Sequence, residues 1–310
     1  MTIFTVWLCA EQVFQKEDFL KLPKVINIAK SAGFCYGVRT AVETAKKLKL
    51  DNKNKKIYIL GALIHNAQVT HELENLGIFT VDKLPENSDN SICIIRTHGE
   101  TPENIEKIRS AGFEIVDLTC PDVKKVQQKA VNLASDGYFV VIIGKENHPE
   151  VIAIKAHALQ ISDKVIVINS KEELLKYTNE LKENKKIGVV IQTTQTVSLV
   201  KEIINELIGL AKELKIENTI CPSTSNRQKE TLKLAQNSDL IVVVGSKTSA
   251  NTTHLAQICA PITKTIHIES EEELQNYSDL IKNSDTISIT AGASTPQELI
   301  EKVEKTIKRL

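Results

Sequence analysis

Short runs of apolar residues alternate with amphipathic helical patterns along most of the chain. Nine runs of six or seven residues, such as KIYILG, YFVVIIG and DLIVVVG, are rich in β-branched residues and predict strands. Stretches between them, such as RTAVETAKKLKL and KEIINELIGLAKELK, repeat apolar residues at helical spacing. This alternation predicts an α/β fold with parallel sheets and crossover helices. Because nine strands would make a wide single sheet, we expect several smaller units.

A cysteine follows a strand-like run and precedes a helical pattern at three places in the chain. They are VINIAKSAGFCYGVRTAVETA, FEIVDLTCPDVKKVQQKA and IENTICPSTSNRQKETLKLA. The cysteines are Cys35, Cys120 and Cys221, separated by 85 (120 − 35) and 101 (221 − 120) residues, about one small α/β unit each. The repetition predicts three similar domains, at 25–119, 120–217 and 218–310, after an N-terminal extension at 1–24. Each domain would contribute one thiolate to a common centre.

Composition and charge narrow the class of protein. Lys and Arg together number 39, as do Asp and Glu, and a zero balance argues against a partner such as nucleic acid or a membrane surface. No run approaches the roughly 18 apolar residues of a spanning helix. No basic residue precedes the short apolar stretch near the start, as it would in a signal peptide. We therefore expect a cytoplasmic location.

The cysteines suggest metal or redox chemistry. Six are present without a CxxC pair, which excludes zinc ribbons, thioredoxin-like motifs and clustered ferredoxin motifs. Three thiolates would leave one metal position open, as a catalytic centre requires. Cys93 and Cys259 lie in apolar runs and are expected in cores, and Cys9 falls in the extension. An iron–sulfur enzyme, a Cys/His metallohydrolase and a non-enzymatic redox sensor all fit this pattern.

Polar residues gather where the predicted strands end. His65, His98 and His148 lie at or just beyond strand ends, as does His71 in the helix that follows. His148 precedes Glu150 in HPE, a plausible proton relay. In open α/β sheets ligands collect at such carboxyl ends.

The turns after two of the predicted strands offer binding sites for an anion. There is no Walker A or GxGxxG motif, yet the turns GSKTSANTT and AGASTPQE both precede helical patterns. Their N–H groups and hydroxyls can bind an anion without net positive charge. A small phosphorylated substrate therefore fits better than an extended polyanion.

Together these motifs resemble the 4-hydroxy-3-methylbut-2-enyl diphosphate reductase (LytB) family. The matching segments, in family order, are AGFCYGVRTAV, LGALIHNAQV, IIRTHGE, LTCPDVKKV, NHPEV, IQTTQT, NTICPSTSNRQ, VGSKTSANTTHL and TAGASTPQELI. They extend from about residue 25 to the C-terminus.

The resemblance implies a trefoil of three α/β domains with pseudo-threefold symmetry around a central 4Fe–4S cluster. Cys35, Cys120 and Cys221 would ligate three irons and leave the fourth open. The family performs a two-electron reductive dehydroxylation, the last step of the methylerythritol phosphate route, giving isopentenyl and dimethylallyl diphosphates. Ferredoxin or flavodoxin would supply the electrons.

The resemblance also assigns roles to the strand-end residues. Glu150 would be the proton source, with Thr193 orienting the substrate hydroxyl and His148 nearby. The allylic diphosphate would be bound by His65, His98, His148, Thr193, Ser249, Ala250, Asn251 and Ser294.

Three residues depart from the usual family pattern. Ala250 replaces a frequent serine, so one hydroxyl contact would be missing while its backbone N–H stays available. Thr97 and Ala153 stand where a smaller residue and a glycine are common. None of these changes touches a cysteine ligand, Glu150 or Thr193.

Overall fold

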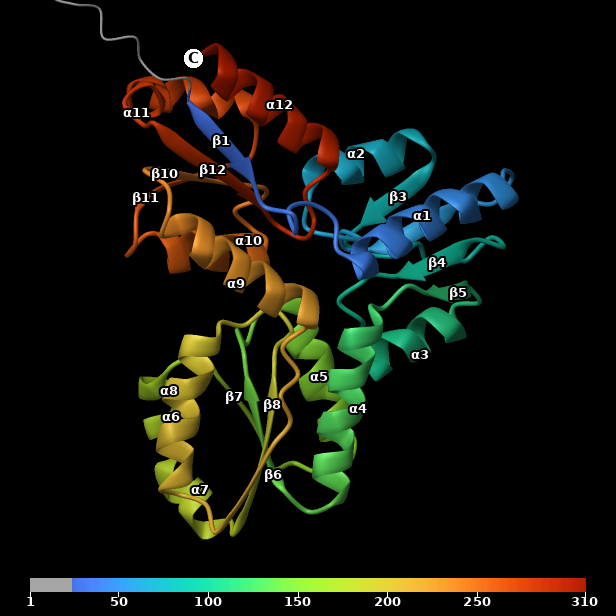
Figure 1. The fold of residues 1–310 in the computed structure, drawn as a ribbon. Helices are drawn as coiled ribbons and strands as arrows, with labels where there is room; N and C mark the ends of the chain where they lie inside the picture. Colours follow the sequence, from blue (N-terminus) through green and yellow to red (C-terminus); the bar gives the residue numbers. More distant parts are fainter. Residues whose placement is uncertain (1–23) are drawn as a thin grey trace, which may run out of the picture.

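The computed structural model describes residues 24–310, which form three α/β units arranged around a centre (Figure 1). Cys9 and the expected extension, up to residue 23, lie outside the described residues. No helix in the described part of the chain combines the length and apolar character needed to cross a bilayer.

Each unit contains one parallel sheet of four strands. The first sheet consists of β2 (Ile57–Leu60), β3 (Ile78–Val81), β4 (Ile92–Ile95) and β5 (Glu114–Asp117). The second consists of β6 (Phe139–Ile143), β7 (Val165–Ile168), β8 (Lys186–Ile191) and β9 (Glu213–Ile216). The third consists of β1 (Val25–Ile28), β10 (Leu240–Val244), β11 (Lys264–Ile268) and β12 (Thr286–Ala291).

Helices cover both faces of every sheet, as parallel strands require. The first unit has α1 (Tyr36–Asp51), α2 (Ala67–Asn75) and α3 (Pro102–Ser110). The second has α4 (Pro121–Ser135), α5 (Pro149–Leu159), α6 (Lys171–Leu175), α7 (Thr178–Glu183) and α8 (Val197–Ile208). The third has α9 (Pro222–Ala235), α10 (Ala250–Cys259), η1 (Glu271–Tyr277), α11 (Ser278–Lys282) and α12 (Gln297–Arg309).

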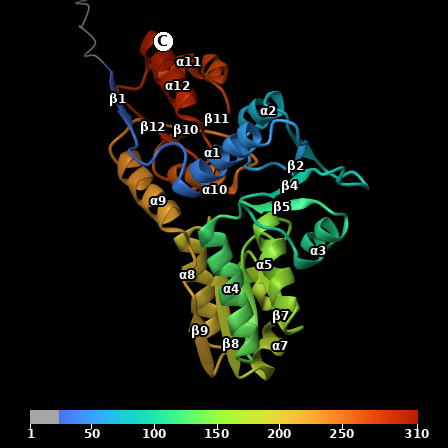
Figure 2. The same ribbon diagram turned by 90° about the vertical axis from the view of Figure 1, so that its right-hand side faces the viewer.

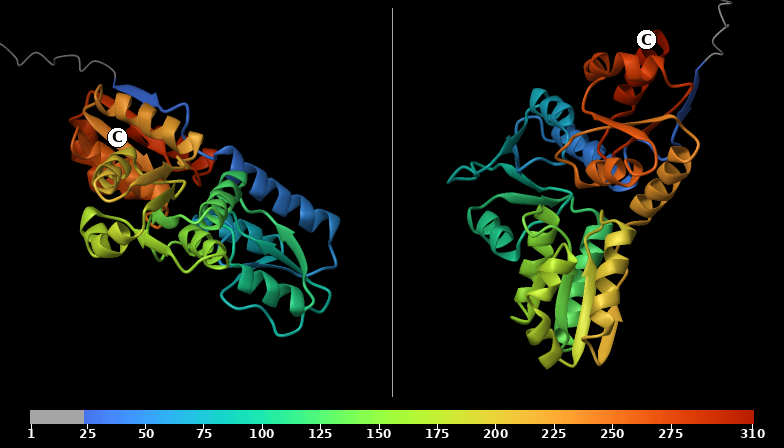
Figure 3. Two further views of the ribbon diagram at one scale, coloured as in Figure 1. Left: turned by 90° about the horizontal axis from the view of Figure 1, so that it is seen from below. Right: turned by 90° about the vertical axis from the view of Figure 1, so that its left-hand side faces the viewer.

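The three sheets have the same strand order, except that the third takes its last strand from the start of the chain. The orders are β3-β2-β4-β5, β7-β6-β8-β9 and β11-β10-β12-β1. β1 pairs in parallel with β12, with Val25 opposite Thr286, and lies against the C-terminal unit in the right-hand view of Figure 3. The expected domains at 25–119 and 218–310 therefore need correction, because 25–28 complete the third sheet.

The burial of a strand decides how clearly its sequence predicts it. β6 and β10 read FVVII and LIVVV and are buried on both faces, so their apolar runs are continuous. β3, β9 and β11 lie at sheet edges and mix polar with apolar residues. The prediction of one helix through KEIINELIGLAKELK was wrong at its end, because α8 stops at Ile208 and β9 pairs with β8.

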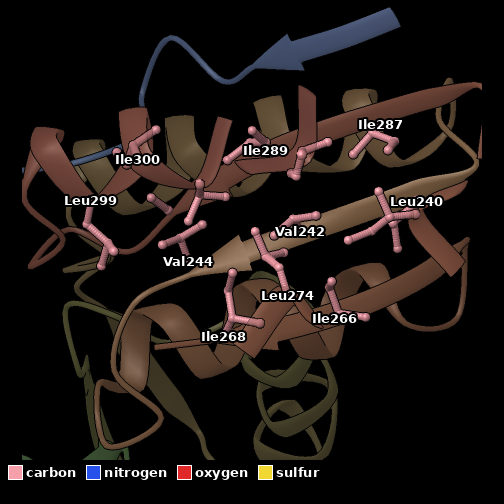
Figure 4. Close-up of a cluster of buried hydrophobic side chains, with 14 residues drawn as sticks. Leu240, Val242, Val244, Ile266, Ile268, Leu274, Ile287, Ile289, Leu299 and Ile300 are labelled. Carbon is pink, nitrogen blue, oxygen red and sulfur yellow. The ribbon is translucent and has the colours of Figure 1, made fainter. Parts of the chain in front are cut away.

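The sheets are held by aliphatic side chains packed against their helices. In the third unit Leu240, Val242 and Val244 of β10 face Ile287 and Ile289 of β12 (Figure 4). α12 closes this cluster with its own buried Leu, Ile and Val residues. Such burial, at about 25 cal/mol per Å² of apolar surface, makes each sheet a rigid platform for the residues at its strand ends.

The helices that begin at the centre are those that follow the Cys-bearing loops. α1, α4 and α9 start near the meeting point of the three units (Figures 1 and 2). Each follows the edge strand of one sheet and packs in the next unit, so each predicted cysteine lies at a junction between units.

Candidate active site

One cavity at this junction is lined by every residue to which the family resemblance assigns a role. Its empty space, which includes a part open to solvent, is about 740 Å³. The predicted residues around it are Cys35, His65, His98, Cys120, His148, Glu150, Thr193, Cys221, Ser249, Ala250, Asn251 and Ser294.

The three cysteines occupy equivalent positions, each preceding the first residue of a helix. Cys35, Cys120 and Cys221 are the N-caps of α1, α4 and α9. Their sulfur atoms face N–H groups of the first helical turn, as in the 3.5 Å contact from Val38 N to Cys35 Sγ. Such N–H groups and the helix dipole stabilise a sulfur that carries negative charge.

A repeated backbone hydrogen bond ties each cysteine to the strand beside it. The N–H of Cys120 donates to the Thr97 carbonyl (3.0 Å), and that of Cys221 to the Thr193 carbonyl (3.0 Å). The N–H of Cys35 donates to the Ala293 carbonyl (3.2 Å). Because these acceptors adjoin or include strand-end residues of the cavity, each unit presents its sulfur and its polar side chains together.

Two of the sulfur atoms, those of Cys120 and Cys221, have raised pKa values and are thiols in the free protein. Burial raises the pKa of Cys221 to about 12, with the neighbouring Asp122 carboxylate adding to the rise, and burial also raises the pKa of Cys120. Asp122 Oδ2 lies 2.9 Å from Cys221 Sγ and 2.8 Å from the Tyr36 hydroxyl. A metal bound here would have to displace thiol protons, as metals do at other cysteine sites.

A glycine leaves room for sulfur at this centre. A Cβ atom at Gly37 would lie 2.7 Å from Cys120 Sγ, closer than real side chains approach. The first turn of α1 can therefore reach the sulfur of α4 only with glycine at this position.

Three histidines form a second cluster in the cavity. Ring centroids lie 4.7 Å apart for His65 and His98, 5.4 Å for His98 and His148, and 5.9 Å for His65 and His148. Burial lowers the pKa of all three, that of His148 to about 3. The charge of Arg96 adds to the effect at each of them, and the charged forms of neighbouring histidines add to it at His98 and His148. They are therefore neutral at pH 7, with His65 Nε2 and His98 Nδ1 buried and without a partner.

Glu150 and Thr193 form a buried acid pair on the second unit. Thr193 donates its backbone N–H to Glu150 Oε1 (2.6 Å) and its hydroxyl to Oε2 (2.8 Å). Burial raises the pKa of Glu150 to about 7, although both hydrogen bonds from Thr193 lower it. A carboxyl with this pKa can hold and release a proton near neutrality.

The third unit supplies hydroxyl and amide groups at the start of α10 and after β12. Ser249 is the N-cap of α10, but its side chain makes no capping hydrogen bond. Both polar side-chain atoms of Asn251 are buried without a partner. Ser294 donates a hydrogen bond to the His65 carbonyl (3.2 Å), which joins this wall to the histidines. Buried polar atoms without partners are rare in proteins, so these are suited to a polar ligand.

Some residues near the cavity were not predicted. Asp122 and Thr224 line it from the first turns of α4 and α9, and proximity to Cys120 and Cys221 in the sequence could have indicated them. His254 Nδ1 lies 2.7 Å from the Thr194 carbonyl and links α10 to the Glu150–Thr193 pair. No sequence signal distinguishes His254 from a core histidine.

Of the remaining residues that the sequence analysis named, one histidine lies outside the cavity and two cysteines lie in hydrophobic cores as expected. His71 is exposed on α2 and does not line the cavity. Cys93 and Cys259 are buried in hydrophobic clusters, which confirms their expected core positions.

The fold and the site define a class of three-unit α/β proteins whose units share one central cavity. The sequence model of the "LytB protein" family matches residues 26–308. The chain is 39% identical over 286 residues to the 4-hydroxy-3-methylbut-2-enyl diphosphate reductase of Aquifex aeolicus, covering 92% of this chain and 96% of that protein. It is 40% identical over 290 residues to the enzyme of the same name from Clostridium perfringens, covering 92% and 99%. The chain belongs to the LytB family.

Solved structures agree with this membership. One is described as (E)-4-hydroxy-3-methyl-but-2-enyl diphosphate reductase, the terminal enzyme of the non-mevalonate pathway. It matches with a TM-score of 0.68 and 38% identity over 93% of this chain and all of that one. A reductase from Plasmodium falciparum matches with a TM-score of 0.84 and 28% identity, over 91% of this chain and 87% of the other. These likenesses confirm the expected three-domain fold.

Proposed function

We propose that this chain reduces (E)-4-hydroxy-3-methylbut-2-enyl diphosphate to isopentenyl and dimethylallyl diphosphates. The overall reaction breaks the carbon–oxygen bond of the allylic alcohol. It consumes two electrons and two protons and releases one water. The observation that carries the proposal is that three thiols, three histidines and the Glu150–Thr193 pair line a single cavity. Family membership supports the same activity.

The cysteines fit an iron–sulfur cluster. Three sulfur atoms from three helix N-termini line the same cavity, and each faces first-turn N–H groups. Gly37 leaves the space beside Cys120 Sγ free. Cys35, Cys120 and Cys221 would hold a 4Fe–4S cluster through three thiolates and leave one iron open. When bound, such a cluster supplies the electrons and a Lewis-acidic site for the substrate oxygen.

The diphosphate would bind among the histidines and the polar groups of α10. His65, His98 and His148 offer ring nitrogens, while Ser249 and Asn251 offer a hydroxyl and an amide. The backbone N–H of Ala250 lies in the first turn of α10, where the helix dipole favours an anion. Ser294 completes this wall. These contacts position the substrate, because the diphosphate itself does not react.

Glu150 would deliver the proton that the departing hydroxyl needs. Its pKa of about 7 keeps much of it protonated at neutral pH, and its depth in the cavity shields that proton from bulk water. Thr193 fixes both carboxyl oxygens and would orient the substrate hydroxyl toward them. His148 adjoins this pair, because its Nδ1 accepts a hydrogen bond from the Glu150 N–H (3.2 Å).

A metallohydrolase is the rival function, and the histidines are the observation in its favour. Nitrogen atoms of His65, His98 and His148 all lie within 4.8 Å of one another, close enough to share a metal ion. The walls around them present the N-terminus of α10, two serines and Asn251. Donor groups of this kind suit an anion better than a cation.

The deciding experiment is anaerobic reconstitution with iron and sulfide, followed by assay with the hydroxymethylbutenyl diphosphate and a chemical reductant. We expect about four irons per chain, broad visible absorption and formation of both products. Cys120→Ser should lose most of the iron and all of the activity, whereas Cys93→Ala, a buried cysteine outside the cavity, should retain both. Full activity of Cys120→Ser, or a metal bound only by the histidines, would refute the proposal.

The electron donor and the location complete the proposal. We propose a ferredoxin or flavodoxin as donor, because the reaction needs low-potential electrons. The cytoplasmic location expected from the sequence stays a prediction.

A further inference from the structure

Arg227 is a charged side chain buried without a charged partner. It lies on α9 with 2% of its surface exposed and is among the largest fully buried side chains of the described residues. Its Nη1 donates to the Ala291 carbonyl (2.7 Å) and its Nη2 to the Gly33 carbonyl (2.9 Å). Nε has no partner, and no carboxylate in the described chain forms an ion pair with the guanidinium.

The two carbonyls place Arg227 at the base of the loop that carries Cys35. Gly33 precedes Cys35 by two residues, and Ala291 precedes by two residues the Ala293 whose carbonyl accepts the Cys35 N–H. Arg227 follows Cys221 by six residues on the same helix. Because helical side chains tilt toward the N-terminus of their helix, Arg227 extends back toward the cavity.

The electrostatic surroundings agree with this position. The negative forms of Cys35 and Cys221 both act on Arg227 and raise the pKa of its guanidinium, opposing the effect of burial. Glu230, one turn further along α9, also acts on it but directs its own oxygens to the N–H groups of Lys30 and Ser31. The negative charges that act on Arg227 are therefore those of Cys35, Glu230 and Cys221, and two of these three residues line the cavity.

A buried charge without a counterion is costly, by several kcal/mol even after relaxation. In the free protein two carbonyl dipoles and the nearby charge of Glu230 stabilise the guanidinium. Metal binding converts the cysteines to thiolates and brings negative charge to the cavity. Reduction of the bound centre adds further negative charge to the cavity.

We infer that Arg227 is the internal countercation of the cysteine-held centre and that its charge raises the reduction potential of the bound cluster. A positive charge fixed in a dry interior stabilises the reduced, more negative form of the centre. The inference rests on the cluster of the proposed function, but not on its substrate.

Substitutions at Arg227 can separate the effect of its charge from the effect of its two hydrogen bonds. Arg227→Gln keeps a donor and removes the charge, while Arg227→Lys keeps the charge and removes the fork of donors. Lys229→Met is the matched control, because it removes one positive charge from an exposed position of the same helix.

The test is spectroelectrochemical titration of the reconstituted holoprotein, with iron content measured for each variant. We expect Arg227→Gln to become at least tenfold harder to reduce, a shift of about 59 mV to more negative potential for one electron. Arg227→Lys and Lys229→Met should remain near wild type. Loss of iron from Arg227→Gln but not from Arg227→Lys would equally support a countercation.

An Arg227→Gln variant with wild-type iron content and unchanged potential would overturn the inference. Loss of iron from Arg227→Lys would do so too, because that variant keeps the charge. A wild-type protein without a redox-active cluster would overturn both this inference and the proposed function. A charge-dependent potential in a protein that does not reduce the diphosphate would refute the proposed substrate alone.

Discussion

Replacing Glu150 with glutamine should increase the stability of the protein while it removes the proposed proton source. Glu150 is 1% exposed, and its pKa is raised from the ordinary 4.5 to about 7, chiefly by burial. The raised pKa means that folding disfavours the ionised carboxylate. Glutamine has nearly the same shape, and its amide oxygen can still accept the Thr193 N–H that now reaches Oε1.

The size of the effect follows from the pKa. A rise from 4.5 to about 7 corresponds to about 3 kcal/mol of folding free energy. Because the folded-state pKa lies above the unfolded one, the contribution of Glu150 to stability is complete below about pH 4.5 and is lost as the pH rises through about 7. Glu150→Gln does not titrate, so above pH 7 it should be the more stable protein. The gain will be below 3 kcal/mol, because a carboxylate accepts stronger hydrogen bonds than an amide.

The assay is urea unfolding of both proteins, at equal cofactor loading, between pH 5 and 8. The difference in unfolding free energy between Glu150→Gln and wild type should grow from pH 5 to about pH 7 and then level off. Titration of the buried histidines affects both proteins alike and cancels in the difference. Glu146→Gln is the control, because it makes the same change at a side chain that is 67% exposed in the same loop. A flat difference for Glu150→Gln would show that Glu150 is ionised in the folded protein and would remove it as the proton source.

Three further predictions concern the diphosphate seat. His98→Ala should raise KM for the substrate about 10-fold to 100-fold, because a hydrogen bond to a charged group is worth about 1.5–3 kcal/mol. The control, His71→Ala on the exposed side of α2, should leave KM unchanged. Equal effects of the two substitutions would contradict a role of His98 in binding the diphosphate. Binding of inorganic diphosphate at pH 7 should take up protons, because the anion raises the lowered pKa values of His65, His98 and His148. Calorimetry in buffers of different ionisation enthalpy would detect the proton uptake. Identical binding enthalpies in all buffers would exclude it. Ala250→Ser should lower KM several-fold by adding a hydroxyl to the cavity wall, at about 0.5–1.5 kcal/mol for one hydrogen bond, and an unchanged KM would place position 250 outside the seat.

Much of the fold was readable from the sequence, because strands buried on both faces leave continuous apolar runs. β6 and β10 are such strands. The edge strands β3 and β11 were missed because their mixed composition carries little periodic signal. Transfer of β1 to the third sheet was not predictable from local pattern, since it depends on pairing between residues about 260 positions apart.

The site was predictable to a similar degree and for a physical reason. Residues such as His98 and Thr193 follow directly after buried strands, and parallel strands bring their ends to a common edge. The family resemblance supplied their roles, which remain proposals. Arg227 and His254 lie inside helices, where sequence alone does not separate a residue that contacts a neighbouring unit from one that packs locally.

The pairing of β1 with β12 has a consequence for the order in which the protein is made. Val25–Ile28 leaves the ribosome well before Thr286–Ala291, so β1 must wait for its partner while the chain between them is synthesised. Two of the three cysteines can reach their final places earlier, because β5 and β9 pair with strands already made. Cys35, held at the end of the waiting strand, is therefore the last sulfur to arrive. The three cysteines should therefore not come together in the nascent chain until the unit that contains β10 and β12 has folded.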